Sequence, residues 1–143
     1  MKFSAIFFAA GASAAIIARR DPVFDVTNFS AGCIQHSTQC LYNFNLTQPG
    51  TGQVTPQVCK ALVSANTDGS LPNVVDGACE ETSRTFSVTK ADEGLTLTVS
   101  QPVTPSSNQT GSHLITNGEL EFEDGPNVHV QRYNGPTSFS LYP

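Results

Sequence analysis

The chain has 143 residues with seven basic and twelve acidic side chains, a formal net charge of −5 at neutral pH. Residues 21–143 keep all twelve acids but only four basic side chains, a net charge of −8 with histidine neutral, which argues against binding of nucleic acid or an anionic membrane through a basic patch. The roughly 123 residues after position 20 suit one domain with a core of moderate size.

The first twenty residues have the layout of a secretory signal peptide. Met1 and Lys2 form a short basic start, residues 3–18 carry no charge, and small residues are frequent over 9–15. This apolar stretch of about 16 residues is shorter than the ~20 that a membrane-spanning helix needs, and no later segment approaches that length. We therefore expect a secreted, extracellular protein with no membrane span.

The end of this segment offers two processing events. Cleavage after Ala18 gives a signal peptide of residues 1–18, and the small residues from Ala14 onward also fit the pattern before a cut. Arg19 and Arg20 form a dibasic pair. This pair is either a second processing site, which trims the chain to residue 21, or a plain polar flank of the signal.

All four cysteines follow the signal segment, and their number is even. In an oxidising compartment they are expected to form two disulfides. Of the three pairings we favour the one that joins near neighbours in the sequence, Cys33 with Cys40 and Cys59 with Cys79. Zinc binding is the rival interpretation, but the chain has no CxxC pair and secretion disfavours it. With no cysteine left over, a disulfide-linked dimer is not expected.

Three Asn-X-Ser/Thr triplets mark candidate N-glycosylation sites at Asn28, Asn45 and Asn108. Asn108 is the best candidate because the polar run 104–112 is typical of an exposed loop. Asn45 is out of phase with the apolar residues on either side, so it is expected to face solvent. Asn28 has the same parity as Val26, which is awkward for glycosylation unless the strand ends before it.

Beyond the signal, nearly every apolar stretch alternates with polar residues at a period of two. Alternation of this kind places one face of a strand on a core and the other in water, and turn-forming Gly, Pro, Asn and Asp residues separate the stretches. We therefore expect residues 21–143 to form a single compact antiparallel β-barrel or sandwich, an all-β fold. The alternating segments are, in chain order, 24–27, 42–46, 85–89, 95–100, 119–123, 128–130 and 139–141.

Two local patterns refine this prediction. Thr55 and Pro56 resemble the start of a helix over residues 57–65, but the apolar residues there alternate equally well, so a strand is favoured. Asn117-Gly118 is the sharpest candidate for a tight hairpin, because both residues of a primed turn favour positive φ.

The sequence contains no pattern that indicates catalysis. His36, His113 and His129 lie outside recognised catalytic spacings, and the chain has no GxSxG elbow, phosphate loop or nucleotide fingerprint. His129, which lies between two valines, is expected on the solvent face of a strand. We expect neither an enzyme nor a cofactor or metal site.

An acidic cluster near the C-terminal end is the most unusual local feature. On a strand, Glu119, Glu121 and Glu123 would project from one face about 7 Å apart. Such a row suits weak binding of a cation or a partner, and two of its carboxylates have the chemistry of a glycosidase pair. The plainer interpretation is a solvated outer face that keeps the strand from pairing with another chain.

Several short segments occur in a characteristic order over most of residues 23–100. They are Phe24 to Ala31, Tyr42-Asn43-Phe44, Cys59-Lys60-Ala61, Cys79, Phe86-Ser87-Val88 and Gly94 to Leu97. Their order and spacing resemble a family of small secreted fungal proteins, the Alternaria major-allergen-like proteins and the related hypersensitive-response-inducing elicitors. The resemblance is diffuse after residue 100.

The resemblance implies a compact antiparallel β-barrel secreted by a fungus, with no established enzymatic activity. Members of the family look like effectors or elicitors that plants perceive and answer with defence or local cell death, and some are allergens. The Cys59–Cys79 pairing matches a bridge of the family. The Cys33–Cys40 pairing departs from the second bridge of the allergen branch, so no binding residue is transferred.

We therefore expect a secreted effector or elicitor that recognises a host extracellular protein or receptor and has no chemistry of its own. The alternatives are a barrel that binds a small apolar ligand, a secreted hydrolase and a cell-wall-associated structural protein. Filling of the barrel by aromatic side chains would close the space for a ligand. The residues expected to fill it are Phe24, Phe44, Phe86, Phe122 and Phe139.

Overall fold

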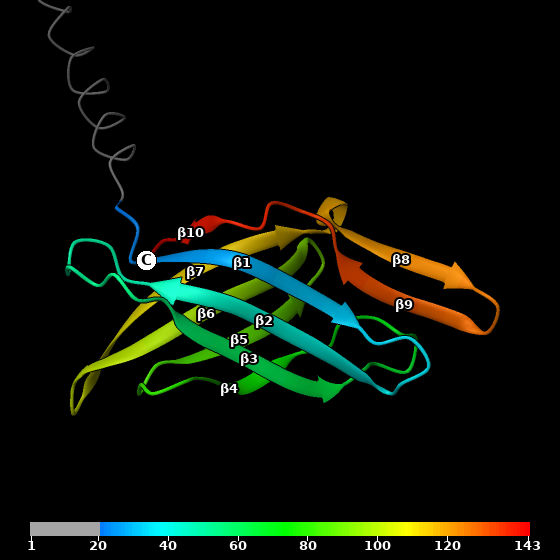
Figure 1. Cartoon of the computed structure of the whole chain (residues 1–143), viewed down its shortest axis with the longest axis horizontal. Helices are drawn as coiled ribbons and strands as arrows, with labels where there is room; N and C mark the ends of the chain where they lie inside the picture. Colours follow the sequence, from blue (N-terminus) through cyan, green and yellow to red (C-terminus); the bar gives the residue numbers. More distant parts are fainter. Residues whose placement is uncertain (1–20) are drawn as a thin grey trace, which may run out of the picture.

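The computed structural model describes residues 21–143, so the predicted signal peptide, the Ala18 cleavage site and the Arg19-Arg20 pair lie outside the described residues. The described chain forms ten antiparallel strands and one short 3-10 helix, η1 (Figure 1). The elements are β1 (Phe24–Cys33), β2 (Gln39–Thr47), β3 (Gln57–Ser64), β4 (Val74–Cys79), β5 (Thr85–Ala91), β6 (Gly94–Thr104), β7 (Ser107–Thr116), η1 (Asn117–Glu119), β8 (Leu120–Gly125), β9 (Val128–Tyr133) and β10 (Phe139–Leu141).

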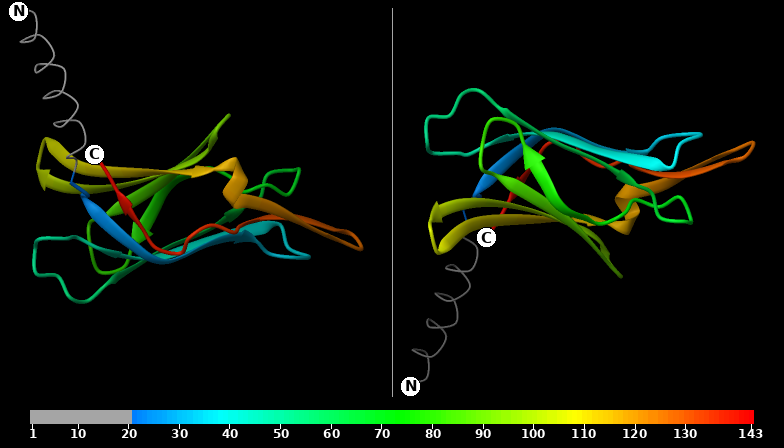
Figure 2. Two further views of the ribbon diagram at one scale, coloured as in Figure 1. Left: turned by 90° about the horizontal axis from the view of Figure 1, so that it is seen from above. Right: turned by 90° about the horizontal axis from the view of Figure 1, so that it is seen from below.

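The sheet is nearly closed into a barrel, which confirms the all-β prediction. Each strand from β1 to β6 pairs with the next along the chain. The short strand β10 then pairs with β1, and a bridge between Ser112 and Tyr142 joins the end of the chain to β7. The hairpin of β8 and β9 touches β1 at the Gly32–Arg132 pair and projects beyond the barrel (Figures 1 and 2).

Aromatic side chains fill the barrel interior. The ring centroids of Phe29 and Phe44 lie 5.9 Å apart and those of Phe44 and Phe86 5.0 Å apart. Phe24, Phe44 and Phe86 are buried as predicted, and Phe139 is partly buried against the core. Phe122 is 39 % exposed, contrary to the prediction, because its hairpin lies outside the barrel.

Both predicted disulfides are present, and each joins directly paired residues of neighbouring strands. Cys33–Cys40 links β1 to β2, and Cys59–Cys79 links β3 to β4. The strand prediction for the segment after Pro56 is also correct, because β3 pairs with β2 over its whole length.

The predicted tight hairpin at Asn117-Gly118 is wrong. These residues begin η1, and β7 and β8 lie at opposite ends of the strand order rather than side by side. The segment is fastened to the β5–β6 turn instead: the Asn117 side chain donates to the Asp92 carbonyl at 2.7 Å, and its N–H donates to the Glu93 carbonyl at 3.1 Å. Contacts distant in the sequence thus override the local turn preference.

Candidate recognition surface

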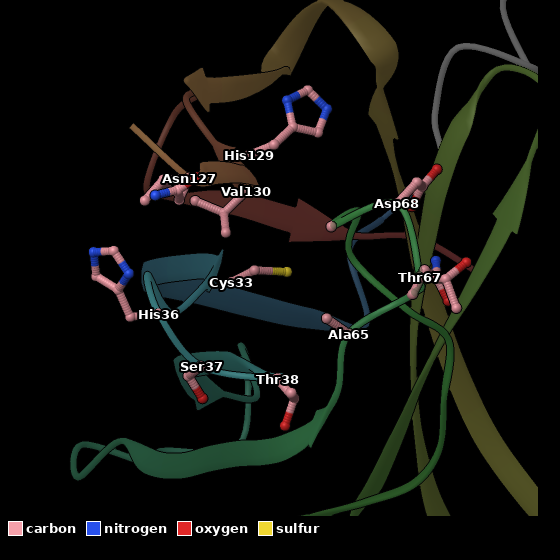
Figure 3. A pocket seen from close by; sticks show the side chains of 13 residues that line it. Cys33, His36, Ser37, Thr38, Ala65, Thr67, Asp68, Asn127, His129 and Val130 are labelled. Atoms are coloured by element: carbon pink, nitrogen blue, oxygen red, sulfur yellow. The ribbon is translucent and has the colours of Figure 1, made fainter. Parts of the chain in front are cut away.

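Three segments at one end of the barrel enclose an open cleft of about 720 Å³ (Figure 3). They are the β1–β2 connection, the loop that follows β3 and the tip of the β8–β9 hairpin. The cleft therefore gathers parts of the chain that are far apart in the sequence. Its lining comes from residues 33, 36–38, 65–69 and 127–130.

Backbone hydrogen bonds hold these segments together. The N–H of Ala65 donates to the carbonyl of Thr38 at 2.8 Å, and the N–H of Gln131 donates to the carbonyl of Gly69 at 3.0 Å. The Gln131 side chain also accepts from the N–H of Leu71 at 2.9 Å. The loop after β3 is thereby tied to both other walls of the cleft.

Gly69 lies where the β3–β4 loop closely approaches the hairpin. Its φ of +83° belongs to the left-handed region, and a Cβ atom there would lie 2.0 Å from the carbonyl oxygen of His129. Only glycine combines this conformation with this approach. The residue type at position 69 therefore sets how tightly the loop meets the hairpin.

The cleft has an apolar floor and a polar rim. In Figure 3 the side chains of Cys33, Ala65 and Val130 face the hollow, whereas His36 and Asp68 point away from it. The Asp68 carboxylate accepts hydrogen bonds from the side chain and the N–H of Ser70, and these bonds lower the pKa of Asp68 below its ordinary value. Asp68 thus stabilises the conformation of its own loop rather than facing the cleft.

The histidines do not gather at one site. His129 is exposed as predicted; its Nδ1 pairs with the Asp124 carboxylate, and its ring stacks on Phe122 with centroids 4.2 Å apart. His113 stacks on Phe139 at 4.0 Å on another part of the sheet, and partial burial lowers its pKa. Among residues 21–143, no group of three or more His, Cys, Asp or Glu side chains is arranged to hold a metal ion.

The predicted row of three glutamates on one strand is wrong. Glu119 belongs to η1, where its carboxylate accepts from the N–H of Thr116 at 3.0 Å. Glu121 and Glu123 do share a face of β8, and both carboxylates contact the Arg132 guanidinium, at 3.0 and 3.2 Å. Glu119 caps η1 and therefore does not lie beside Glu121 and Glu123 on the face of β8.

A small group of exposed apolar side chains lies on the outer face of β2 and β3, beside the end of β1. Leu41 and Leu62 are direct cross-strand partners and are 37 % and 54 % exposed, and Leu41 in turn pairs with Gly32 on β1. Ile34, also exposed, and Leu41 line a second open cleft of about 520 Å³ that Arg132 borders. The group and the adjoining cleft are the part of this face that a protein partner could contact through apolar side chains.

Arg84 is buried at the opposite end of the barrel, and the sequence did not single it out. Its guanidinium donates to the side-chain oxygens of four glutamines, and it lies over the Phe24 ring at 5.5 Å. Within the described chain no ion pair with a carboxylate involves it. Burial lowers the pKa of Arg84. The glutamines are Gln48 (3.2 Å), Gln53 (3.3 Å), Gln57 (2.5 Å) and Gln101 (2.8 Å).

The three candidate glycosylation sites lie in different backbone settings. A bulge between Thr27 and Ser30 gives Asn28 a φ of +54° and turns it outward, although the strand continues. Asn45 is half-buried on β2. Asn108 is exposed, but the predicted loop around it is wrong, because β6 and β7 continue as a paired hairpin there.

Comparison of the chain with protein-family models, with curated proteins and with solved structures finds no match. The likeness to the fungal elicitor family therefore stays an expectation from the sequence. No helix within residues 21–143 has the length and apolarity needed to cross a membrane.

Proposed function

We propose that this protein is a secreted effector or elicitor that acts by binding a host extracellular protein or receptor. The observation that carries the proposal is the contrast between the core and the exterior of the barrel. Packed aromatic rings occupy the interior, while apolar side chains and two open clefts lie on the outside around one end. This distribution favours contact with a macromolecule over enclosure of a small one.

The filled interior weighs against the alternative of an apolar ligand held inside the barrel. Phe29 contacts Phe44, Tyr133 and Phe139, and Phe44 contacts Phe86, so the rings form a continuous chain across the core. A ligand would have to displace side chains that pack at the density of a protein core.

The disulfides suit an extracellular protein with a preorganised surface. They close loops with sequence separations of 7 and 20 residues, for which the chain-entropy treatment gives about 2.5 and 3 kcal/mol of stabilisation. Cys33–Cys40 also joins the two strands that carry the first wall of the cleft. A wall held in this way loses little conformational entropy when a partner binds.

Infiltration of plant leaves tests the proposal. Purified, disulfide-intact protein is compared with a reduced and alkylated sample at equal concentration, and defence-gene induction and necrosis are scored. We expect a response to the folded protein alone, because the proposed surface exists only in the fold. An equal response to both samples, or no response to either, contradicts the proposal.

A cell-wall structural role is the second candidate, and a sedimentation assay separates it from the first. The protein is mixed with insoluble chitin or glucan and the bound fraction is measured after washing. A recognition protein of the kind proposed is expected to stay in the supernatant. Retention at low micromolar concentration would favour the structural role instead.

A further inference from the structure

β8 lies at one end of the described strand order and pairs only with β9. At the other end, the outer edge of β7 meets the end of the chain at the single Ser112–Tyr142 bridge, and β10 pairs with β1. No strand of the described sheet pairs with the outer edge of β8, and the hairpin projects beyond the barrel in both views of Figure 2. The free edge is therefore accessible along β8.

The register shows which backbone groups face outward from this edge. The N–H of Asn134 donates to the carbonyl of Glu119 at 2.7 Å, and hydrogen-bonded and non-hydrogen-bonded pairs alternate along an antiparallel ladder. Phe122 and Asp124 therefore fall at non-hydrogen-bonded positions and turn their N–H and C=O groups away from β9. The opposite residue confirms this phase, because Gln131, the partner of Phe122, donates its N–H to Gly69 rather than to β8.

The side chains along the edge select what can pair with it. Glu121 and Glu123 lie on one face and share a single cation, Arg132, so that face keeps an excess of negative charge. Phe122 lies on the other face and is partly exposed. Two copies of β8 paired about Phe122 would place Glu121 opposite Glu123, and like charges directly opposite are destabilising. This register therefore disfavours a second copy of this chain, whereas the charge of the edge is complementary to a basic strand.

We propose that the free edge of β8 accepts an extended segment of the partner protein, in which lysine or arginine alternates with apolar residues. The apolar residues pair with Phe122 and present their backbone to its N–H and C=O, and the basic residues lie beside Glu121 and Glu123. Main-chain hydrogen bonds supply affinity in such strand addition, and the alternating side chains supply specificity. This inference rests on the proposed function and names the chemistry of its partner.

A synthetic peptide tests the inference with the disulfide-intact protein. The probe is a fluorescein-labelled ten-residue peptide of alternating lysine and valine, and its control is the same peptide with methylated valine nitrogens. We expect saturable binding of the probe by fluorescence anisotropy and slower hydrogen exchange of the Phe122 and Asp124 amides. The methylated peptide is expected to bind at least tenfold more weakly. Absent binding, or equal binding of both peptides, overturns the inference.

Substitutions at Phe122 separate the backbone contribution from that of the side chain. Phe122→Pro removes an N–H that the hairpin does not use, and proline is tolerated at such edge positions. We expect it to weaken probe binding at least tenfold, whereas the matched Phe122→Ala variant keeps the N–H and loses about threefold. Equal affinities of the two variants overturn the inference. Should Phe122→Pro unfold the hairpin, the amide-exchange measurement on the unaltered protein decides.

A double variant tests how much the two glutamates of β8 contribute to peptide binding. Glu121→Gln combined with Glu123→Gln is expected to weaken binding about fivefold at low salt and to flatten its salt dependence. An unchanged affinity overturns the assignment of a basic partner. The outcomes also separate this inference from the proposed function. A leaf response without probe binding overturns only the β8 assignment, and probe binding without a leaf response overturns only the elicitor role.

Discussion

Gly69 offers a direct test of how the cleft is built, because the chain contains a matched control. Gly69 and Gly52 have nearly the same conformation, with φ of +83° and +77°. A Cβ atom at Gly69 would lie 2.0 Å from the His129 carbonyl oxygen, whereas one at Gly52 would meet nothing within 4 Å. Replacing each with alanine therefore separates the backbone cost from the contact cost.

The expected loss of stability follows from these contacts. An alanine at positive φ costs about 1–2 kcal/mol, and the stiffer unfolded chain offsets about 0.4–1 kcal/mol of this. Gly52→Ala should therefore lower the free energy of unfolding by about 1 kcal/mol. Gly69→Ala must also move the loop away from the hairpin and give up the hydrogen bond from Gln131, which raises its expected loss to about 3 kcal/mol.

Urea unfolding of both variants with intact disulfides measures the difference, and hydrogen exchange of the Gln131 amide locates it. We expect faster exchange of that amide in Gly69→Ala only. Equal losses of stability in the two variants would refute the reasoning, since the contact between the loop and the hairpin would then contribute nothing.

Three further predictions concern ionisable groups. Gln57→Glu places a carboxylate on the buried Arg84 guanidinium, so we expect the free energy of unfolding in urea to rise by about 1 kcal/mol at pH 7. This gain should be lost below about pH 4, where the new carboxyl is protonated. A change in stability that does not depend on pH would contradict this prediction. His113 has a lowered pKa, so the unfolded chain binds its proton first and stability should decline as the pH falls below about 6.5. His113→Phe keeps a ring on Phe139 and should weaken that decline in urea titrations from pH 7 to 5. Burial, with Glu119 nearby, raises the pKa of Tyr133 to about 12 from 10.0. The unfolded chain therefore loses the phenol proton first, and the stability that the protonated Tyr133 contributes should be lost as the pH rises from 10 to 12. The rise in absorbance at 295 nm from ionised Tyr133 should occur near pH 12, and Tyr133→Phe should remove this part of the titration.

The features that could be predicted from the sequence are those that depend on neighbours along the chain. Alternation placed Phe44 inward and Asn45 toward the outside because the side-chain direction on a strand has a period of two. The disulfides followed because near neighbours in the sequence lie on adjacent antiparallel strands. These are local rules, and the barrel obeys them over most of its length.

The features that escaped prediction depend on contacts distant in the sequence. Asn117-Gly118 has the composition of a tight turn, but its bonds to the β5–β6 turn direct the chain into a crossing instead. Asn28 faces outward because of a bulge that the period-two pattern does not reveal. A lone Arg84 is ordinarily read as a surface residue. Its burial depends on four glutamines that only the folded barrel brings together.

The acidic residues of β8 connect these observations to function. On an isolated edge strand, charges of one sign are a common device against unwanted pairing. Here the same charges stand beside outward-facing backbone groups and an exposed Phe122, so they repel another copy of the chain while leaving the edge open to a basic strand. A device that excludes one partner and admits another defines specificity. The hairpin projects beyond the nearly closed barrel (Figure 2), and β10 pairs with β1 rather than with β8, so the outer edge of β8 is left for such a strand.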